Sequence, residues 1–254
     1  MKDIHSHILF SIDDGSKSIE ESINIIKQAS SFGYTDIVLT PHYRKIQNYT
    51  CNNEEKQKLF DELNKELKKQ NIDVNIYLGN EVTIDDDLFK NIKDKKVTTI
   101  NNGRYMLLEL PFNSRISGIN DIIIELNSKG ITPIIAHPER YRYYHNNYDK
   151  LQRMIDSGAL FQGNLYSLYN KRSKSKKMLE GMLKRHMIHF IGTDIHSDKQ
   201  KVYKKEKRII RKLTRLTKDR DMAIELIDTN IDKVINNKYI EPYEVKSKKG
   251  SIFK

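Results

Sequence analysis

Short apolar runs alternate along the chain with amphipathic segments of helical period. Ile19, Ile23 and Ile26 recur at helical spacing, behind a capping-box sequence that begins at Ser18. The apolar run at 36–40 is typical of a buried strand. This first unit therefore predicts a helix followed by a strand.

The same alternation continues through most of the chain. Leu59, Leu63 and Leu67 mark a charged amphipathic helix. Further strand-like runs lie near 74–78, 105–110, 131–136, 160–162 and 188–191, and further helical patterns lie near 119–128, 149–157 and 173–185. Repeated strand–helix units imply a mostly parallel sheet, either open or closed into a barrel. We therefore expect one α/β domain over residues 1–254, with a basic helical C-terminal part at about 199–254.

The positive charge of the chain is concentrated in one segment. The 254 residues carry 45 Lys and Arg against 34 Asp and Glu, a net charge of +11. Residues 171–218 hold seventeen of the basic and four of the acidic side chains, net +13, which leaves −2 for the rest. A basic surface attracts nucleic acid, an acidic membrane or phosphorylated substrates, although solvated helix faces give the same count. Helical patterns in 201–228, with Ile209, Ile210, Leu213 and Leu216, predict a helix with one face buried against the barrel or a neighbouring subunit.

Composition argues against several classes of protein. No run approaches the roughly 18 apolar residues of a membrane-spanning helix, and the first residues lack the apolar run of a secretory signal. The single cysteine, Cys51, cannot form an internal disulfide, so we expect a cytoplasmic protein. Cysteine-dependent tyrosine phosphatases need a Cys-x5-Arg loop, but the residue six positions after Cys51 is Gln57. The chain also lacks a Gly-x-Ser-x-Gly elbow, a P-loop and a dinucleotide fingerprint.

Potential metal ligands recur after the predicted strands. A His-x-His pair ends the first strand, and an Asp-x-His pair follows the last one. The nine candidates are His5, His7, Asp14, His42, Glu81, Glu109, His137, Asp194 and His196. Each alone is more often a structural or solvated residue, but the carboxyl ends of parallel strands converge on one face of a barrel. Five imidazoles and four carboxylates suit two or three divalent ions, such as manganese, iron or zinc, rather than one tetrahedral ion.

Several motifs that contain these ligands also carry a family resemblance. They are Asp3-Ile4-His5-Ser6-His7-Ile8, Asp13-Asp14-Gly15, Thr40-Pro41-His42, Gly79-Asn80-Glu81, Arg104-Tyr105-Met106-Leu107-Leu108-Glu109, Gly130-Ile131-Thr132-Pro133-Ile134-Ile135-Ala136-His137-Pro138-Glu139-Arg140 and Gly192-Thr193-Asp194-Ile195-His196. With them the chain resembles the PHP (polymerase and histidinol phosphatase) superfamily of metal-dependent phosphoesterases over residues 1–198. Within that superfamily it is similar to the bacterial CpsB/CapC-type tyrosine phosphatases of capsule and exopolysaccharide synthesis.

The resemblance implies a distorted (βα)7 barrel, TIM-like and of the PHP type, that holds three metal ions. We expect manganese first, with iron or zinc as alternatives. The first two implied ligand groups share Glu81 as a bridge. They are His5, His7, Glu81 and Asp194 for one ion and Glu81, Glu109 and His137 for the second, while Asp14, His42 and His196 would hold the third. Arg140, His42 and His196 are the expected catalytic residues.

Cations near these ligands are candidates for phosphate binding. Arg140 is expected to grip the phosphate by a bidentate contact, with a surface ion pair to Glu139 as the alternative. Arg44 is a second candidate, although a solvated loop arginine is an equal reading. Family members often carry an arginine beyond the Asp-x-His pair, where this chain has Lys199 and Lys201. A lysine supplies positive charge but lacks the bidentate contact of a guanidinium. This difference from the family therefore leaves the affinity and preference for substrates open.

The favoured prediction is a metal-dependent protein-tyrosine phosphatase. The resemblance implies that its substrate is a membrane-associated bacterial tyrosine autokinase, reached in the cytoplasm at the inner face of the membrane. One alternative is another PHP phosphoesterase, acting on a small phosphomonoester such as histidinol phosphate or on nucleic-acid ends. Another is a nucleic-acid-binding protein with structural metals, whose Tyr141, Tyr143 and Tyr144 stack bases. With the favoured prediction no nucleic-acid partner is expected, and a homo-oligomer is left open.

Overall fold

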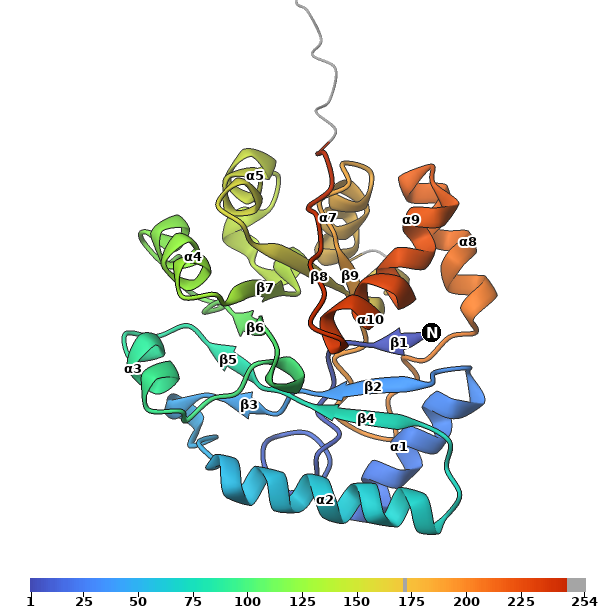
Figure 1. Ribbon diagram of the computed structural model, residues 1–254. Coiled ribbons are helices and arrows are strands. Elements are labelled where there is room, and N and C mark those ends of the chain that lie inside the picture. Colours follow the sequence, from blue (N-terminus) through green and yellow to red (C-terminus); the bar gives the residue numbers. More distant parts are fainter. Residues whose placement is uncertain (171–172, 246–254) are drawn as a thin grey trace, which may run out of the picture.

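Parallel strands form the centre of the molecule (Figure 1). The computed structural model describes residues 1–170 and 173–245, and within them nine strand segments pair in parallel. The segments are β1 Lys2–Asp3, β2 Asp36–Leu39, β3 His42–Tyr43, β4 Asn75–Leu78, β5 Glu81–Thr83, β6 Tyr105–Glu109, β7 Thr132–Ala136, β8 Leu160–Asn164 and β9 Phe190–Gly192. The predicted strands are present, but β1 ends at Asp3, so His5 and His7 lie in the loop beyond it rather than at its end.

The segments close into a distorted barrel. Hydrogen-bonded neighbours follow the order β1-β2-β4 in one sheet and β3-β5-β6-β7-β8-β9 in the other. Only the dipeptide at 40–41 separates β2 from β3, and only that at 79–80 separates β4 from β5, so each pair is one interrupted strand. A parallel bridge between Ser6 and Ile195 joins the continuations of β1 and β9. The described segments thus occupy seven strand positions, and the predicted seven-stranded, TIM-like barrel is confirmed.

Helices surround the strands in Figure 1. They are α1 Ile19–Ser31, α2 Asn53–Lys69, α3 Leu88–Lys93, α4 Ile119–Ser128, α5 Tyr148–Asp156, α6 Leu165–Tyr169, α7 Lys174–Leu183, α8 Glu206–Thr217, α9 Arg220–Ile224 and α10 Asn230–Ile235. The predicted cap of α1 is confirmed, because the Ser18 side chain accepts the Glu21 N–H. In the described residues, no helix is both long enough and apolar enough to cross a bilayer.

The C-terminal part differs in detail from its prediction. Its helix begins at Glu206 rather than at 199. Ile209, Leu213 and Leu216 are buried against the rest of the molecule, as their spacing predicts. The prediction is wrong for Ile210, which is only partly buried because it lies between the buried face and the exposed face of the helix. Lys171 and Arg172, at the start of the basic segment, and residues 246–254 lie outside the described residues.

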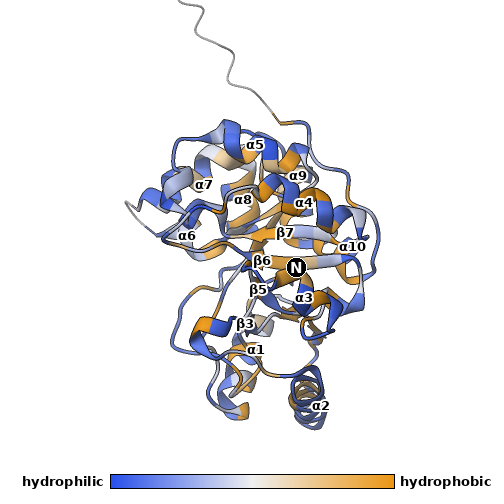
Figure 2. Ribbon diagram, turned by 90° about the vertical axis from the view of Figure 1, so that its left-hand side faces the viewer, coloured by the Kyte–Doolittle hydropathy of each residue, from blue (hydrophilic) through white to orange (hydrophobic). Residues whose placement is uncertain are grey.

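The alternation of side chains along each strand points the site residues into the barrel. In β6, Tyr105 and Leu107 belong to an inner apolar cluster. Met106 and Leu108, which alternate with them, belong to the outer core under the helices. Glu109 continues the inner series at the carboxyl end of the strand. Ile231 and Val234 of α10 fill the inner cluster, so apolar packing occupies the barrel below the polar end. In Figure 2 the ribbon has apolar stretches among the central strands, and the helices around them alternate between apolar and polar residues.

Candidate active site

Glu81, the first residue of β5, lies at the centre of the expected ligands. Its Oε2 atom lies 3.3 Å from His5 Nε2, 3.2 Å from His7 Nε2 and 3.0 Å from His42 Nδ1. Its other oxygen, Oε1, lies 3.0 Å from His137 Nε2. Among the described residues, Oε2 is buried without a hydrogen-bond partner. An unpaired, buried carboxylate oxygen that faces three imidazoles has the environment of a bridging metal ligand.

The expected ligands form three overlapping groups. Within the described residues, their ligand atoms lie within 4.8 Å of one another in the following sets: His5, His7, Glu81 and Asp194; His7, Asp14, His42 and His196; and His42, Glu81 and Glu109. The first set has the members expected for the first ion. The set expected for the third ion recurs with His7 added, and the remaining set has His42 where His137 was expected. His137 Nε2 still lies 3.6 Å from Glu109 Oε1.

Two of these ligands follow their strands in an unusual backbone conformation. His137, after β7, has a φ of 33°, and Asp194, after β9, has a φ of 54°. Positive φ is uncommon in residues other than glycine and costs conformational energy. The surrounding packing therefore holds both side chains in positions that local propensity alone does not favour.

Hydrogen bonds orient the imidazole rings. His7 Nδ1 lies 2.8 Å from Asp13 Oδ2, and the same oxygen accepts the backbone N–H of His42 at 2.8 Å. His5 Nδ1 lies 2.9 Å from Gln162 Oε1. When Nδ1 is held in this way, Nε2 of His5 and His7 is directed at the site, which is how proteins fix metal-binding histidines. In the sequence Asp13 stands out only as part of the motif Asp13-Asp14-Gly15, and a single glutamine in a strand, such as Gln162, carries no detectable signal.

The buried charges support one another. Burial alone would lower the pKa of His5, but the carboxylates of Glu81 and Asp194 raise it above its ordinary value. Burial alone would raise the pKa of Glu81, but the imidazoles of His5 and His42 hold it well below its usual range. Asp194, against the same rings, also has a lowered pKa. The carboxylates of Glu81 and Asp194 are therefore ionised at neutral pH, as cation binding requires.

Arg140 lies at the rim of the site. Its Nη1 donates to Asp194 Oδ2 at 2.8 Å, and Asn164 Nδ2 donates to the same oxygen at 2.8 Å. The guanidinium lies over the ring of Phe112, 4.8 Å from its centroid. The alternative pairing with Glu139 is wrong, because that residue is buried and its Oε1 accepts the backbone N–H of Asn164. With 39% of its side chain exposed, Arg140 can offer its other N–H groups to a ligand.

The other candidate cations occupy different positions. Arg44 pairs with the Glu109 carboxylate through Nη2 and donates from Nε to Thr83 Oγ1 at 3.0 Å, so it is not a solvated loop arginine. Lys199 is exposed and does not line the cleft beside the site. Lys201 does line this cleft, whose volume is about 460 Å³. Of the two lysines, Lys201 therefore has the better position to contact a substrate.

The tyrosine cluster of the nucleic-acid alternative is mostly part of the core. Tyr141 and Tyr144 are buried, and the Tyr141 hydroxyl accepts the backbone N–H of Leu110 at 2.9 Å. Tyr143 donates to the Pro111 carbonyl at 2.7 Å. The prediction that Tyr141 and Tyr144 stack nucleic-acid bases is therefore wrong, because neither ring is exposed.

Cys51 is unsuited to nucleophilic chemistry. Its thiol is partly buried, and this burial together with a hydrogen bond to Glu55 raises its pKa to about 12. Because the thiolate is the nucleophile, a thiol with this pKa is inert at neutral pH.

Comparisons with known proteins extend over most of the chain. The sequence model of the family described as "Capsular polysaccharide synthesis, CpsB/CapC" matches residues 1–236, past the point at 198 where the motifs end. The chain is 42% identical over 205 residues to CapC of Staphylococcus aureus, a match that covers 78% of this chain and 77% of that protein. It is 31% identical over 204 residues to the tyrosine-protein phosphatase YwqE of Bacillus subtilis, covering 78% of each.

Solved structures agree with the sequence matches. A crystal structure from a study of YwqE of Bacillus subtilis and CpsB of Streptococcus pneumoniae, described as unique metal-dependent tyrosine phosphatases, superposes with a TM-score of 0.87. That match has 26% sequence identity and covers 98% of this chain and 100% of the other. Histidinol phosphate phosphatase from Lactococcus lactis has a TM-score of 0.56 at 14% identity, covering 86% of this chain and 93% of that one, and shares the fold.

Proposed function

Because the chain belongs to the CpsB/CapC family, we propose that it is a metal-dependent protein-tyrosine phosphatase, a phosphoric monoester hydrolase of capsule or exopolysaccharide synthesis. The observation that carries this proposal is the buried Glu81 carboxylate, which faces imidazoles contributed by several different strand ends. Such a cluster at the carboxyl end of a parallel barrel is where this class of fold builds its active sites.

The donor atoms fit two or three divalent ions. The unpaired Glu81 Oε2 and the overlapping sets of nitrogen and oxygen atoms support this fit. We propose the nine expected ligands as metal ligands, with manganese as the first choice and iron or zinc as alternatives. Bound ions of this kind lower the pKa of water and neutralise charge on a phosphoryl group.

Two histidines flank the outer carboxylate of the site. Nε2 of His42 and Nε2 of His196 lie 3.6 and 3.7 Å from Asp14 Oδ1. Burial lowers the pKa of His42, and burial with the neighbouring His7 lowers that of His196 to about 4. Both rings are therefore neutral at pH 7, and each offers a nitrogen lone pair to an ion or a proton. We propose both as catalytic residues on this ground.

Arg140 stabilises the phosphoryl group in this proposal. Its planar guanidinium carries N–H groups in a fork that matches two phosphoryl oxygens, and Asp194 and the Phe112 ring hold its position. Arg44 stays a second candidate for phosphate binding, although its ion pair with Glu109 occupies one of its N–H groups. Lys201 supplies further positive charge in the neighbouring cleft, and Lys199, the earlier candidate, lies outside that lining.

An apolar rim next to these cations suits an aromatic substrate. Phe112 and Ile46 are exposed, and both line a hollow of about 690 Å³ that also contains Arg44 and Glu109. A phenyl ring can pack there while its phosphate reaches the ligand cluster. Phenolate, whose parent pKa is about 10, also leaves more readily than an alkoxide, so phosphotyrosine needs less help from a general acid.

The phosphotyrosine partner that we propose is a protein, specifically a membrane-associated bacterial tyrosine autokinase. The resemblance to the CpsB/CapC phosphatases supports this partner, and it would bring the chain to the inner face of the membrane in the cytoplasm. Assembly into a homo-oligomer stays an open part of the prediction.

Metal analysis combined with hydrolysis assays tests the proposed function. The purified protein should contain at least two divalent ions per chain and should hydrolyse a phosphotyrosine peptide faster than a phosphoserine peptide or histidinol phosphate. Chelation should abolish this activity, and manganese should restore it. Faster hydrolysis of histidinol phosphate would select the small-phosphomonoester alternative, and activity that survives complete metal removal would refute the mechanism.

A further inference from the structure

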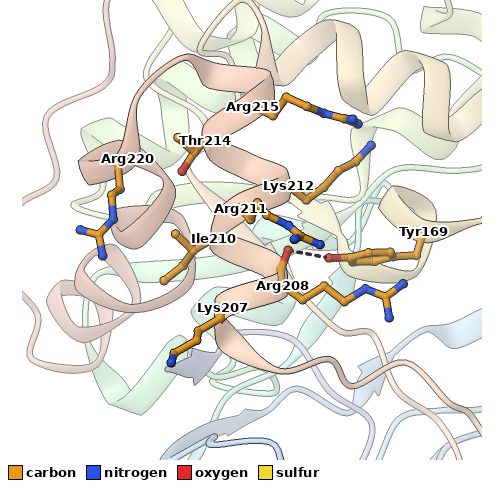
Figure 3. Close-up of a pocket in the computed structure, with 9 residues that line it drawn as sticks. All are labelled: Tyr169, Lys207, Arg208, Ile210, Arg211, Lys212, Thr214, Arg215 and Arg220. Atoms are coloured by element: carbon orange, nitrogen blue, oxygen red, sulfur yellow. Dashed lines mark hydrogen bonds between the residues drawn. The ribbon is translucent and has the colours of Figure 1, made fainter.

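A strongly basic hollow of about 910 Å³ lies on the outside of the barrel, apart from the ligand cluster (Figure 3). Its lining residues within the described part of the chain include six cations and no carboxylate, and we call them the basic groove: Lys207, Arg208, Arg211, Lys212 and Arg215 of α8, and Arg220 of α9, with Tyr169, Ile210 and Thr214. Five of these cations belong to the segment 171–218, whose net charge of +13 exceeds the +11 of the whole chain.

The spacing of residues along α8 explains why these cations share one face. Ile209, Leu213 and Leu216 bury the opposite face of the helix. Arg208, Arg211, Lys212 and Arg215 then follow at intervals of three and four residues and lie next to one another on the exposed side. Like charges at this spacing repel each other, so an anion bound across them would relieve the repulsion.

Little acidic charge balances the basic groove. Lys212 pairs with Glu180 at 2.6 Å. Among the described residues, Lys207, Arg211 and Arg215 form no ion pair within 4.0 Å. These long side chains are exposed, and their uncompensated charges point to an anionic ligand.

The basic groove adjoins the cleft of the active site. The short helix α6 separates them, since Tyr166 and Ser167 line the cleft whereas Tyr169 lines the basic groove. Five helical residues are about 7.5 Å long, a distance that two or three residues of extended peptide span. Lys201 in the cleft, and Lys204 with its Nζ 5.9 Å from the centroid of the Tyr169 ring, continue the positive charge between the two.

We propose that the basic groove docks an acidic segment of the same polypeptide whose phosphotyrosine enters the active site. This inference rests on the proposed function and names the substrate class more closely: phosphotyrosine flanked, a few residues away, by a run of aspartate, glutamate or further phosphorylated residues. Docking raises the affinity for such substrates through charge complementarity, while the chemistry at the ligand cluster is unchanged.

The shape of the surface favours a peptide over a lipid bilayer. A membrane-binding helix presents protruding apolar side chains that enter the bilayer. The exposed large apolar residues of the described chain lie elsewhere, at Ile46, Phe112, Ile124, Tyr166 and Tyr239, and the cations of α8 border a hollow instead. An extended acidic chain can lie in such a hollow along the row of cations.

A charge-removal variant with a matched control tests this inference. The test variant is Arg211→Ala/Arg215→Ala, since both side chains are exposed and alanine preserves the helix. The control, Lys58→Ala/Lys65→Ala on α2, removes the same charge from exposed positions of another helix. Arg211→Lys/Arg215→Lys keeps the charge and should behave as the wild-type chain does.

Each protein is assayed on three substrates: a phosphotyrosine peptide with an acidic flank, the same peptide with the flank changed to glutamine and asparagine, and para-nitrophenyl phosphate. The wild-type chain should prefer the acidic flank through KM. In the test variant this preference should fall about fivefold, with kcat and the small substrate unaffected. The preference should also decline as salt is raised, because exposed charges are screened.

Binding measurements separate this inference from the proposed function. Fluorescence anisotropy of the acidic peptide with unmodified tyrosine reports docking without catalysis, and its affinity should fall in the test variant alone. Equal affinities in the test and control variants would overturn the docking proposal even if all phosphatase activity is intact. It would also be overturned if the test variant loses binding to phosphatidylglycerol vesicles or DNA while its peptide binding is unchanged. A chain that binds the acidic peptide but hydrolyses no substrate would instead refute the proposed function.

Discussion

Replacing Arg140 by alanine removes the cation at the rim of the site and leaves the ligand cluster in place. Asp194 would lose the donor Nη1 at 2.8 Å, but Asn164 Nδ2 also donates to its Oδ2 at 2.8 Å. The carboxylate therefore keeps a partner that orients it. The expected defect lies in stabilising the phosphoryl group rather than in holding metal.

The size of the defect follows from the exposure of the guanidinium. Removing a positioned donor that stabilises transition-state charge costs about 100- to 1000-fold in kcat, equivalent to about 3–4 kcal/mol. Water screens part of the interaction, because 39% of the Arg140 side chain is exposed. We therefore expect a loss near the lower end, about 100-fold. Arg140→Lys should recover only part of this loss, since an ammonium lacks the bidentate fork.

Steady-state kinetics on a phosphotyrosine peptide, together with metal content by mass spectrometry, measures this effect. Arg142→Ala is the matched control, because Arg142 is an exposed arginine only two residues further on. The control should retain wild-type kcat, and all variants should keep the wild-type metal content. Wild-type turnover in Arg140→Ala would refute the reasoning. A parallel loss of metal would show instead that Arg140 acts by holding Asp194.

Three further outcomes are expected. Gln162→Leu removes the partner of His5 Nδ1 and should weaken metal binding about 10- to 100-fold, seen as a higher metal concentration for half-maximal activity; an unchanged concentration would contradict this role. Burial lowers the pKa of His189 from 6.5 to about 3. As the pH falls below 6.5, the imidazole is therefore protonated in the unfolded chain but not in the folded one, and the free energy of unfolding decreases. Urea unfolding should show a loss of about 2 kcal/mol between pH 6.5 and 5, and His189→Asn should remove this contribution; identical pH profiles would refute it. Cys51→Ser should keep wild-type kcat/KM, because burial raises the thiol pKa to about 12, and an inactive variant would contradict the metal-dependent mechanism.

Local pattern was sufficient for the order of strands and helices and for the convergence of most site residues. Helical spacing in Ile19, Ile23 and Ile26 predicts α1, and the structure contains it at Ile19–Ser31. The position of Glu109 at the end of an apolar strand predicts that it reaches the polar end of the barrel, where it lies near His137. Such predictions succeed because the periodicity of side chains and the shared direction of parallel strands are local properties.

Contacts across the barrel were decided only by the tertiary structure. The second ligand set contains His42 where His137 was expected, because the interrupted strands pair His42 directly with Glu81. Gln162 hydrogen-bonds to His5 although 157 positions separate them in the sequence. Nothing in the sequence of its strand distinguishes Gln162 as a residue of the site.

The surface around the site shows the same division. The sequence by itself determined that residues 171–218 are basic and that α8 is amphipathic. It could not determine that Tyr169 of α6 borders that helix, or that Lys201 rather than Lys199 lines the cleft. The physical reason is that composition and period set which face of an element is polar, whereas the closure of the chain into a barrel sets which polar faces meet.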